Sequence, residues 1–383
     1  MKRLVNGICF TLILIIGSFV DIHAKITTVQ IFSLESESEM ELEAEFSRLE
    51  SLGINTVIIR VFKNKYDTPY KIINENDDEG IYFKSQNEPL VSNLLPLIIS
   101  IAHKHNISVY AWITTRKCSW ILSEHPEWDS LRFDVVARDF KPSDQLDIFN
   151  PAVRKRLQTM LMDLADTGIE GILLQDDLVS RQFDDFRTSL WLSFDGQQFN
   201  EDSFYTLFSK MNQHSKYLPR YYEWNFYKSK AICSFIGEFL GPIKKKHPEI
   251  KLAANVYYET VTQPGYARLW LSQDLEWMIS TPLDTFAIMA YQRQMTYELD
   301  TSLENVLKTL SNAAELLNSS YLMSNNSIFW KIQIEDWSSG NHVNYKELMS
   351  STLAAGNFSI TIVPYRGISS LNYIEPIIAA NSD

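Results

Sequence analysis

Cysteine is scarce in this sequence. Only Cys9, Cys118 and Cys233 occur among 383 residues, and the first lies in an N-terminal apolar run. Cys118 and Cys233 could form one disulfide in an oxidising compartment or remain as two buried thiols. The seven histidines are scattered, and no Cys or His spacing typical of a metal site is present. We therefore expect no metal ion and no cofactor.

Glycine-rich turns and basic stripes are also missing. The turn after the first predicted strand reads FSLESESE and contains no glycine, which argues against a doubly wound fold with a glycine-rich phosphate turn. The formal net charge is −12, and no Lys/Arg stripe is available to neutralise phosphates. Nucleic acid is therefore not an expected partner. An acidic surface is compatible with a cationic or neutral substrate.

A short apolar run near the N-terminus indicates secretion. Lys2 and Arg3 precede the run Ile8–Val20, and Ile22-His23-Ala24 has the character of a cleavage site. The run is short and is followed by cleavage-like residues, so it is typical of a secretory signal peptide rather than of a membrane span. We predict a signal peptide over 1–24 and a mature secreted or periplasmic protein without a membrane span.

Short apolar runs alternate with helix-like segments along the rest of the chain. The predicted strands are Thr27–Leu34, Ile54–Phe62, Ile107–Thr115, Ile169–Leu174, Leu252–Tyr258, Phe286–Gln292, Ile328–Ile334 and Phe358–Tyr365. The predicted helices cover 39–52, 88–105, 151–167, 183–192, 204–211, 222–246, 266–280, 302–317 and 344–355. This alternation predicts a single α/β domain over 25–383, a (β/α)8 TIM barrel with long loops after strands 2, 3 and 4. An open doubly wound sheet is the alternative.

Two adjacent carboxylates, Asp176 and Asp177, follow the fourth predicted strand. Chemistry in parallel α/β folds is found at the carboxyl ends of strands. Neighbouring carboxylates separate each other's pKa values, so one can hold a proton while the other stays charged. That division suits acid/base cleavage of a glycosidic bond. A solvated strand end or a helix cap is the structural alternative, and because side chains alternate along a strand the two need not both point inward.

Aromatic, amide and acidic side chains stand at the ends of the other predicted strands. Aromatic rings serve as stacking platforms in sugar-binding clefts, although they also fill protein cores. A buried amide such as Asn255 needs hydrogen-bond partners. We predict substrate-binding roles for Trp112, Asn255, Tyr258, Glu259, Tyr291, Glu335, Trp337 and Tyr365. The alternatives are a helix or turn cap for Glu259 and a barrel-core position for Trp112.

The segment GILLQDDL (171–178) resembles the strand-four signature of the C-terminal hydrolase domain of PgaB-type poly-β-1,6-N-acetylglucosamine N-deacetylases, which is assigned to glycoside hydrolase family 153. In that family the paired Asp residues are associated with catalysis. Further segments are similar to the family in the same order: 150–165, 251–279, 284–291 and 331–337. The chain departs from the family pattern at Glu170, Gln175 and Ala254, where the family has Asp, His and Arg.

The resemblance implies an extracytoplasmic glycoside hydrolase that cleaves β-1,6-linked, partly deacetylated poly-N-acetylglucosamine within the polymer. Deacetylation is not predicted, because the resemblance does not extend to the deacetylase domain and its metal site. In this hypothesis Asp177 is the general acid. Asp176 stabilises the oxocarbenium ion or orients a group that does, and a 2-acetamido group of the substrate takes the place of a separate nucleophile. Exopolysaccharide export machinery is an expected partner. The alternatives are a non-catalytic carbohydrate-binding barrel in polymer assembly or export, and a related glycosidase acting on another polysaccharide.

Overall fold

The computed structural model describes residues 26–67, 69–72, 77–208, 219–324 and 327–380. The predicted signal peptide and its cleavage site lie outside these residues. Within the described part of the chain, no helix combines the length and the apolar character needed to cross a bilayer.

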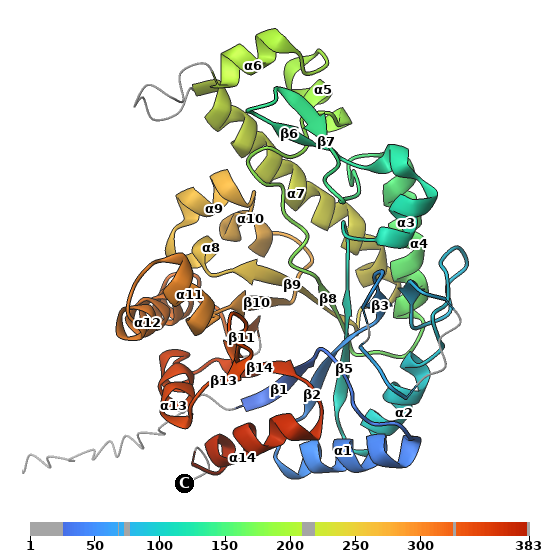
Figure 1. Cartoon of the computed structure of the whole chain (residues 1–383), viewed down its shortest axis with the longest axis vertical. Helices are drawn as coiled ribbons and strands as arrows, with labels where there is room; N and C mark the ends of the chain where they lie inside the picture. The colour runs from blue at the N-terminus through green and yellow to red at the C-terminus, as the bar shows by residue number, and fades with distance from the viewer. Residues whose placement is uncertain (1–25, 68, 73–76, 209–218, 325–326, 381–383) are drawn as a thin grey trace, which may run out of the picture.

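A closed barrel of eight parallel strands forms the centre of the molecule (Figure 1). Neighbouring strands follow one another in chain order, and the barrel closes where β14 pairs with β1. The strands are β1 (Ile26–Ile31), β2 (Thr56–Arg60), β5 (Ser108–Ile113), β8 (Gly171–Leu174), β9 (Lys251–Tyr257), β10 (Thr285–Met289), β11 (Ile328–Gln333) and β14 (Ser359–Tyr365). The predicted (β/α)8 barrel is therefore confirmed, and each predicted strand overlaps one barrel strand.

The strands can be apolar along their length because both of their faces are covered. Every residue of β8, β10 and β11 is buried, as expected for parallel strands between a packed interior and outer helices. Gly171 has a specific role in this interior. A β-carbon at this position would overlap the ring of Tyr110 on the adjacent strand. The glycine therefore leaves room for the Tyr110 ring, which packs edge-on against Phe329 with centroids 5.1 Å apart.

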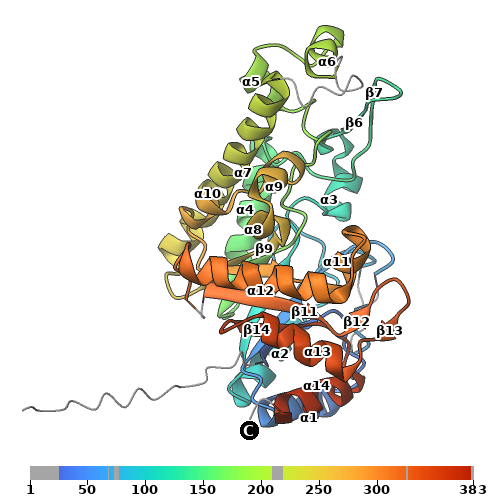
Figure 2. The same cartoon turned by 90° about the vertical axis from the view of Figure 1, so that its left-hand side faces the viewer.

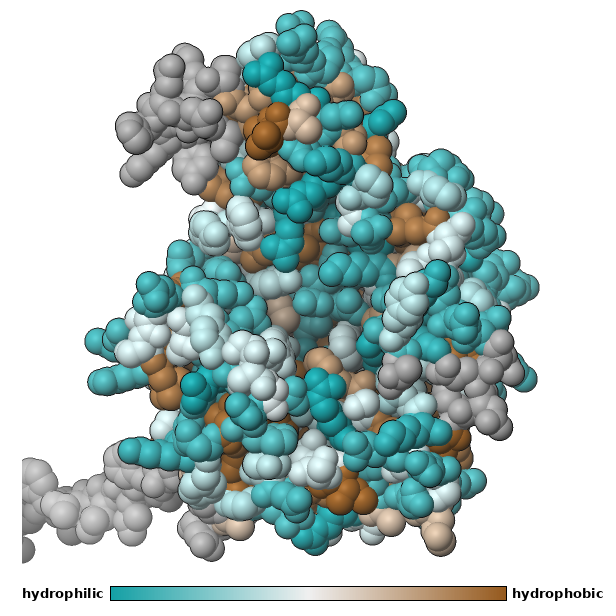
Figure 3. All heavy atoms as spheres, in the orientation of Figure 1, coloured by the Kyte–Doolittle hydropathy of each residue, from teal (hydrophilic) through white to brown (hydrophobic). Residues whose placement is uncertain are grey.

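Helices surround the barrel (Figures 1 and 2). They are α1 (Glu39–Ser51), α2 (Leu95–Lys104), α4 (Pro151–Ala165), α7 (Pro219–Lys246), α8 (Glu259–Thr262), α9 (Pro264–Trp270), α10 (Leu275–Ile279), α11 (Gln292–Glu298), α12 (Leu303–Ser319), α13 (Tyr345–Ala354) and α14 (Leu371–Ala380). Asn150 caps α4 as its sequence predicts, since its side chain accepts a hydrogen bond from the Ala152 amide at 2.9 Å. Hydrophilic residues cover most of the face seen in Figure 3.

Several helix predictions differ from the structure. The helix predicted over 88–105 begins only at Leu95, because the backbone of Pro89 and Val91 hydrogen-bonds to Ile81 instead. The helix predicted over 266–280 is two helices, α9 and α10, interrupted where Ser272 has a positive φ. Helix α14 was not predicted at all.

The long loops after β2, β5 and β8 are present as predicted. They contain two short hairpins, β3–β4 (Phe62–Lys63 and Gly80–Ile81) and β6–β7 (Arg132–Asp134 and Asp139–Lys141), and the helices α3 (Ser119–Glu124), α5 (Ser189–Asp195) and α6 (Glu201–Phe208). A third hairpin, β12–β13 (Glu335–Asp336 and Asn341–His342), follows β11.

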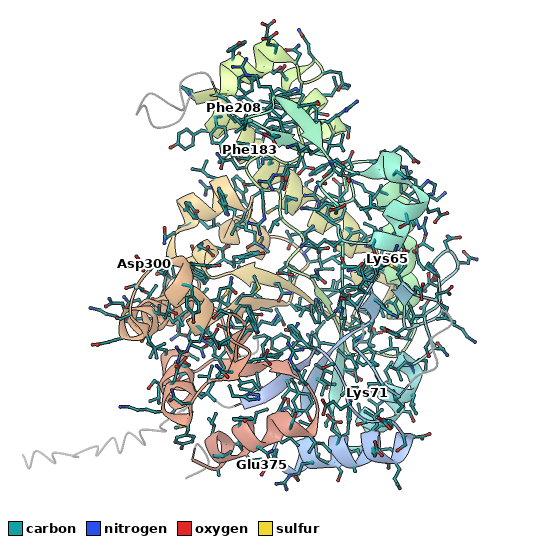
Figure 4. All side chains as sticks on the ribbon, viewed as in Figure 1. Lys65, Lys71, Phe183, Phe208, Asp300 and Glu375 are labelled. Carbon is teal, nitrogen blue, oxygen red and sulfur yellow. The ribbon has the colours of Figure 1, made fainter. Side chains whose placement is uncertain are left out.

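The hairpin β6–β7, helices α5 and α6 and the first part of α7 form a lobe that projects from the barrel in both views (Figures 1 and 2). Its core is aromatic: Phe183 and Phe208, labelled in Figure 4, pack with centroids 5.9 Å apart. Phe186 packs on Trp191 and Trp224 in the same core. Many of the chain's aromatic residues therefore fill this core rather than a sugar-binding cleft.

The two cysteines within the described part of the chain are both free and buried. Cys118 precedes α3 and Cys233 lies within α7. Burial raises the pKa of each thiol, which keeps both thiols protonated and unreactive at neutral pH. Of the two alternatives that the sequence left open, the structure contains buried thiols.

Candidate active site

A cavity of about 500 Å³ opens at the carboxyl ends of the barrel strands. Residues from every part of the barrel except β2 contribute to it, so distant sequence segments meet around one space. Its lining includes seven residues that the sequence predicts: Trp112, Asp176, Asn255, Tyr258, Tyr291, Glu335 and Trp337. The other lining residues are Gln30, Phe32, Tyr257, Met289, Gln294, Met295, Lys331 and Arg366.

Asp176 lies in the turn that follows β8 and lines the cavity while half-buried. Strand β8 ends at Leu174, so the alternation of its side chains does not constrain residues 175–177. Burial raises the pKa of the Asp176 carboxyl, and the charge of Asp177 raises it further. The cations Lys331 and Lys117 oppose this shift. Asp176 therefore has the environment of a carboxyl group that can hold a proton above its ordinary pKa.

Asp177 lies next to Asp176 but points into the loop that follows β5 instead of into the cavity. Its carboxylate accepts hydrogen bonds from the backbone amides of Thr115 (3.0 Å), Arg116 (2.7 Å) and Lys117 (2.8 Å). The hydroxyl of Thr115 donates to it at 2.8 Å, and the hydroxyl of Thr114 donates to it as well. Both oxygens are occupied by protein donors, so Asp177 ties the turn after β8 to the end of β5.

A buried charge network holds the same loop from its other side. Arg116, which has no solvent exposure, donates to Asp185 at 2.8 Å and to the carbonyl oxygen of Val179. Lys228 of α7, also buried, donates to the carbonyl oxygen of Arg181 at 2.6 Å. The segment after β8 is therefore fixed to β5 and to α7, which gives Asp176 a defined position.

Aromatic rings form the walls of the cavity. Phe32 and Trp112 pack with centroids 5.0 Å apart on one side. Tyr291 and Trp337 meet edge to face at 4.7 Å on the other side, and Trp337 is exposed. The Tyr257 hydroxyl donates to the backbone carbonyl of Asp176 at 3.5 Å, so it lies over the turn that carries the carboxyl group. Walls of this kind fit the apolar faces of sugar rings.

Lys331 is a buried charged residue of the cavity that the sequence analysis did not identify. It lies in β11 with no solvent exposure, lines the cavity, and donates a hydrogen bond from Nζ to Asn255 Oδ1. Burial lowers the pKa of Lys331 to about 7, while the carboxylate of Asp176 opposes the shift. The signal was present in the strand IFWKIQI, because a lysine inside an apolar strand is almost never buried without a partner.

An ion pair closes the rim of the cavity. Arg366 Nε lies 3.0 Å from Glu335 Oε2, and the Arg366 guanidinium stands over the Phe32 ring at 5.6 Å. The predicted Glu335 is therefore at the cavity but engaged by Arg366, a partner that the sequence did not indicate.

Two of the predicted substrate-binding residues, like Asp177, are not part of the cavity lining. Glu259 is the first residue of α8, and burial raises its pKa. Tyr365 is fully buried between the barrel and α1, where burial and the nearby Glu45 raise its pKa. Both follow strand ends, but their side chains point elsewhere, which residue order alone could not decide.

Among the described residues, no group of three or more His, Cys, Asp or Glu side chains could hold a metal ion.

Comparison with models of known protein families assigns the chain to a family. Residues 34–365 match the model of a family described as hypothetical glycosyl hydrolase family 13. The chain belongs to this family. The class of enzyme predicted from the paired carboxylates, a glycoside hydrolase, is thereby confirmed. No curated protein sequence matches the chain.

The fold is similar to those of several solved glycoside hydrolases. The glycoside hydrolase domain of PgaB (BpsB) from Bordetella bronchiseptica is 17% identical with a TM-score of 0.66, and the match covers 94% of this chain and 96% of that one. An α-L-fucosidase isoenzyme from Paenibacillus thiaminolyticus (13%, TM-score 0.60) and a β-amylase catalytic domain from Paenibacillus polymyxa (10%, TM-score 0.57) match 94% of this chain and 49% and 100% of their own. The resemblance to the PgaB hydrolase domain is confirmed, and at these identities it establishes the fold.

Proposed function

We propose that this protein is an extracytoplasmic glycosidase that cleaves β-1,6-linked, partly deacetylated poly-N-acetylglucosamine within the polymer, with Asp176 as its general acid. The observation that carries the proposal is the different placement of the two neighbouring carboxyl groups. Asp176 lines an aromatic-walled cavity at the carboxyl end of the barrel and has a raised pKa. Asp177 is occupied by donors from the loop after β5.

The chemistry requires a proton donor near the leaving oxygen. A protonated Asp176 gives its proton to the glycosidic oxygen as the bond to C1 breaks, and burial, which raises the pKa of Asp176, favours the protonated form that this step needs. The other cavity carboxylate, Glu335, is paired with Arg366 at the rim. We therefore assign the stabilisation of C1 to the carbonyl oxygen of the substrate's own 2-acetamido group. Water then opens this intermediate and returns a proton to Asp176, which completes the cycle.

Asp177 then has a different role from the one that the sequence suggested. It positions the turn that carries Asp176, through the loop amides of Thr115, Arg116 and Lys117. This assignment exchanges the roles of the two residues: Asp176 becomes the acid, and Asp177 acts on the reaction only through its neighbour.

The cellular setting of the proposal comes from the sequence. The predicted signal peptide supports a secreted or periplasmic enzyme. The net charge of −12 suits a polymer whose deacetylated units are cationic. Exopolysaccharide export machinery remains the proposed partner, and Trp112, Asn255, Tyr258, Tyr291 and Trp337 are the proposed substrate-binding residues at the cavity.

The test is the release of reducing ends from partly deacetylated β-1,6-linked glucosamine polymer, with product analysis by mass spectrometry. The wild-type protein should release oligosaccharides, and Asp176→Asn should lower the rate by about 100-fold or more while the circular dichroism spectrum is unchanged. Undiminished cleavage by Asp176→Asn would remove the assignment. Binding of the polymer by the wild-type protein without any cleavage would instead favour a non-catalytic carbohydrate-binding barrel.

A further inference from the structure

The cavity lining contains the ammonium group of Lys331, which has more N–H donors than hydrogen-bond partners. Lys331 has no solvent exposure, yet its Nζ makes one hydrogen bond within the described part of the chain, to Asn255 Oδ1. An ammonium group carries three N–H donors. Burying a charge without satisfying its donors is costly, and Lys331 lines the cavity. Its remaining donors therefore need an acceptor that enters the cavity.

Two further polar atoms at the same cavity lack partners among the described residues. Gln30 Oε1 is an acceptor on a side chain that is 1% exposed, and Trp112 Nε1 is a donor on a side chain that is 8% exposed. Both residues line the cavity with Lys331. Native structures leave few buried polar groups unsatisfied. Donors and an acceptor around one space indicate a ligand with complementary polar groups.

The charges that line the cavity cancel one another, although the whole chain is strongly acidic. Lys331 and Arg366 are the cations of the lining, and Asp176 and Glu335 are its anions. Arg366 and Glu335 already form an ion pair. Moving a proton from Lys331 to Asp176, which gives Asp176 the proton that it needs as an acid, leaves the sum unchanged. The neutral amine of Lys331 then still has one N–H donor beyond the one bonded to Asn255. A cationic or anionic sugar would leave an uncompensated charge in this partly buried space, whereas an uncharged sugar would not.

We propose that Lys331 is a specificity-determining residue that donates a hydrogen bond to the acetamido carbonyl oxygen of an uncharged N-acetylated sugar bound over Asp176, and that a free-amine sugar is disfavoured at this position. Gln30 and Trp112 supply the acceptor and the donor for the same sugar's remaining polar groups. The inference rests on the proposed function for its class of substrate, an amino-sugar polymer. It adds the residue that selects the acetylated unit at which the proposed mechanism cleaves, while the cationic units bind outside the cavity.

Binding of small glycosides tests this without requiring cleavage. Isothermal titration calorimetry at pH 7 would compare methyl N-acetyl-β-glucosaminide, methyl β-glucosaminide and methyl β-glucuronide with the wild-type protein and with Lys331→Met. The N-acetylated glycoside should bind the wild-type protein most tightly. Lys331→Met should lose about 10-fold or more of this affinity, because a hydrogen bond to a charged group is lost. Its affinity for the free-amine glycoside should fall less or rise.

The matched control is Lys104→Met, which removes an exposed lysine of α2 paired with Glu43 and should leave all three affinities unchanged. Tighter wild-type binding of the glucosaminide or the glucuronide would overturn the proposal, as would the absence of binding by all three. The wild-type comparison stands even if Lys331→Met folds poorly. A protein that binds the N-acetylated glycoside selectively but does not cleave the polymer would contradict the proposed function and leave this inference intact.

Discussion

Asp176 and Asp177 are adjacent in sequence and chemically identical, yet their surroundings differ. The turn after β8 directs Asp176 into the cavity and Asp177 toward three consecutive backbone amides of the loop after β5. The same substitution at the two positions should therefore have different effects. At Asp176 the effect should be on chemistry, and at Asp177 it should be on the stability of the loop.

Asp177→Asn should lower the free energy of unfolding by about 1–3 kcal/mol. The substitution leaves one oxygen for the amides of Arg116 and Lys117 and places an NH2 group against the amide and the hydroxyl of Thr115, so a buried donor loses its acceptor and the negative charge that all these donors face is removed. Chemical denaturation followed by tryptophan fluorescence measures this change, with Asp176→Asn as the control that should change stability less. Equal effects of the two substitutions on stability would mean that Asp177 does not anchor the loop.

Lys331 gives the stability of the protein a pH dependence with a definite sign. Its pKa is lowered to about 7 from an ordinary value of 10.5. Between these values the unfolded chain binds a proton that the folded protein has released, so folding becomes more favourable as the pH rises. Lys331→Met removes this contribution. The stability of Lys331→Met relative to wild type should therefore decrease by about 1 kcal/mol or more from pH 7 to pH 10.

Denaturation curves of both proteins at several pH values across this window measure the difference directly. The hydrogen bond lost to Asn255 shifts the comparison by a similar amount at every pH, so the slope isolates the titration of Lys331. If the stability of Lys331→Met relative to wild type stays constant or rises with pH, the pKa of Lys331 in the folded protein is not lowered.

At the scale of elements, the barrel strands could be predicted from the sequence because each is an apolar run that must be covered on both faces. The strands Phe286–Gln292 and Ile328–Ile334 were predicted almost where β10 and β11 lie. Helix starts were harder to predict. Residues 88–94 have a helix-like apolar pattern, but their backbone pairs with Ile81 of the short strand β4, and such a long-range contact leaves no local signal.

The direction of individual side chains was the other limit of the sequence-based prediction. Asp176, Asn255 and Tyr291, which their places at or near strand ends suggested, line the cavity. They also suggested Tyr365, which the structure directs toward α1 instead. Lys331 was not predicted, because its strand has the apolar character of a barrel strand buried on both faces. A polar residue inside an apolar strand deserved the same weight as the acidic residues at strand ends.

The contact between β5 and β8 inside the barrel gives a prediction about packing. Gly171→Ala would place a β-carbon about 2.3 Å from the nearest atom of the Tyr110 ring, which is itself packed against Phe329. We expect a loss of about 1–3 kcal/mol in the free energy of unfolding. Thermal unfolding measures it, with Gly237→Ala in α7 as the control. A β-carbon at Gly237 has no neighbour within 4 Å in the described structure, and alanine there should stabilise the helix by about 0.5–1 kcal/mol. A neutral Gly171→Ala would contradict this account of the barrel interior.

At the scale of the whole molecule, the net charge of the chain and the local charges of the cavity have different effects on the substrate. The chain carries a formal net charge of −12, while the charges that line the cavity balance. The long-range field of an acidic protein concentrates a cationic polymer near its surface. The short-range balance in the cavity selects the unit that is bound over Asp176. The sequence could give only the first of these, because the local balance depends on which side chains the barrel brings together.

Salt should therefore affect polymer and small ligand differently. Raising the ionic strength from about 0.05 M to about 0.5 M shortens the screening length well below that at physiological salt. The KM for partly deacetylated polymer should rise several-fold, since its attraction to the acidic surface is weakened. The affinity for methyl N-acetyl-β-glucosaminide should stay nearly constant. Steady-state kinetics and calorimetry at both ionic strengths measure the two responses. A KM that does not depend on salt would argue against a cationic substrate.

The central claim is that Asp176 donates the proton to the leaving group. It is tested most directly by comparing wild type and Asp176→Asn on two substrates, the β-1,6-linked polymer and an aryl β-N-acetylglucosaminide with an acidic phenol leaving group. The phenol needs no protonation, so Asp176→Asn should lose about 100-fold or more of the activity on the polymer and much less on the aryl glycoside. Equal losses on both substrates, or an undiminished rate on the polymer, would contradict the claim.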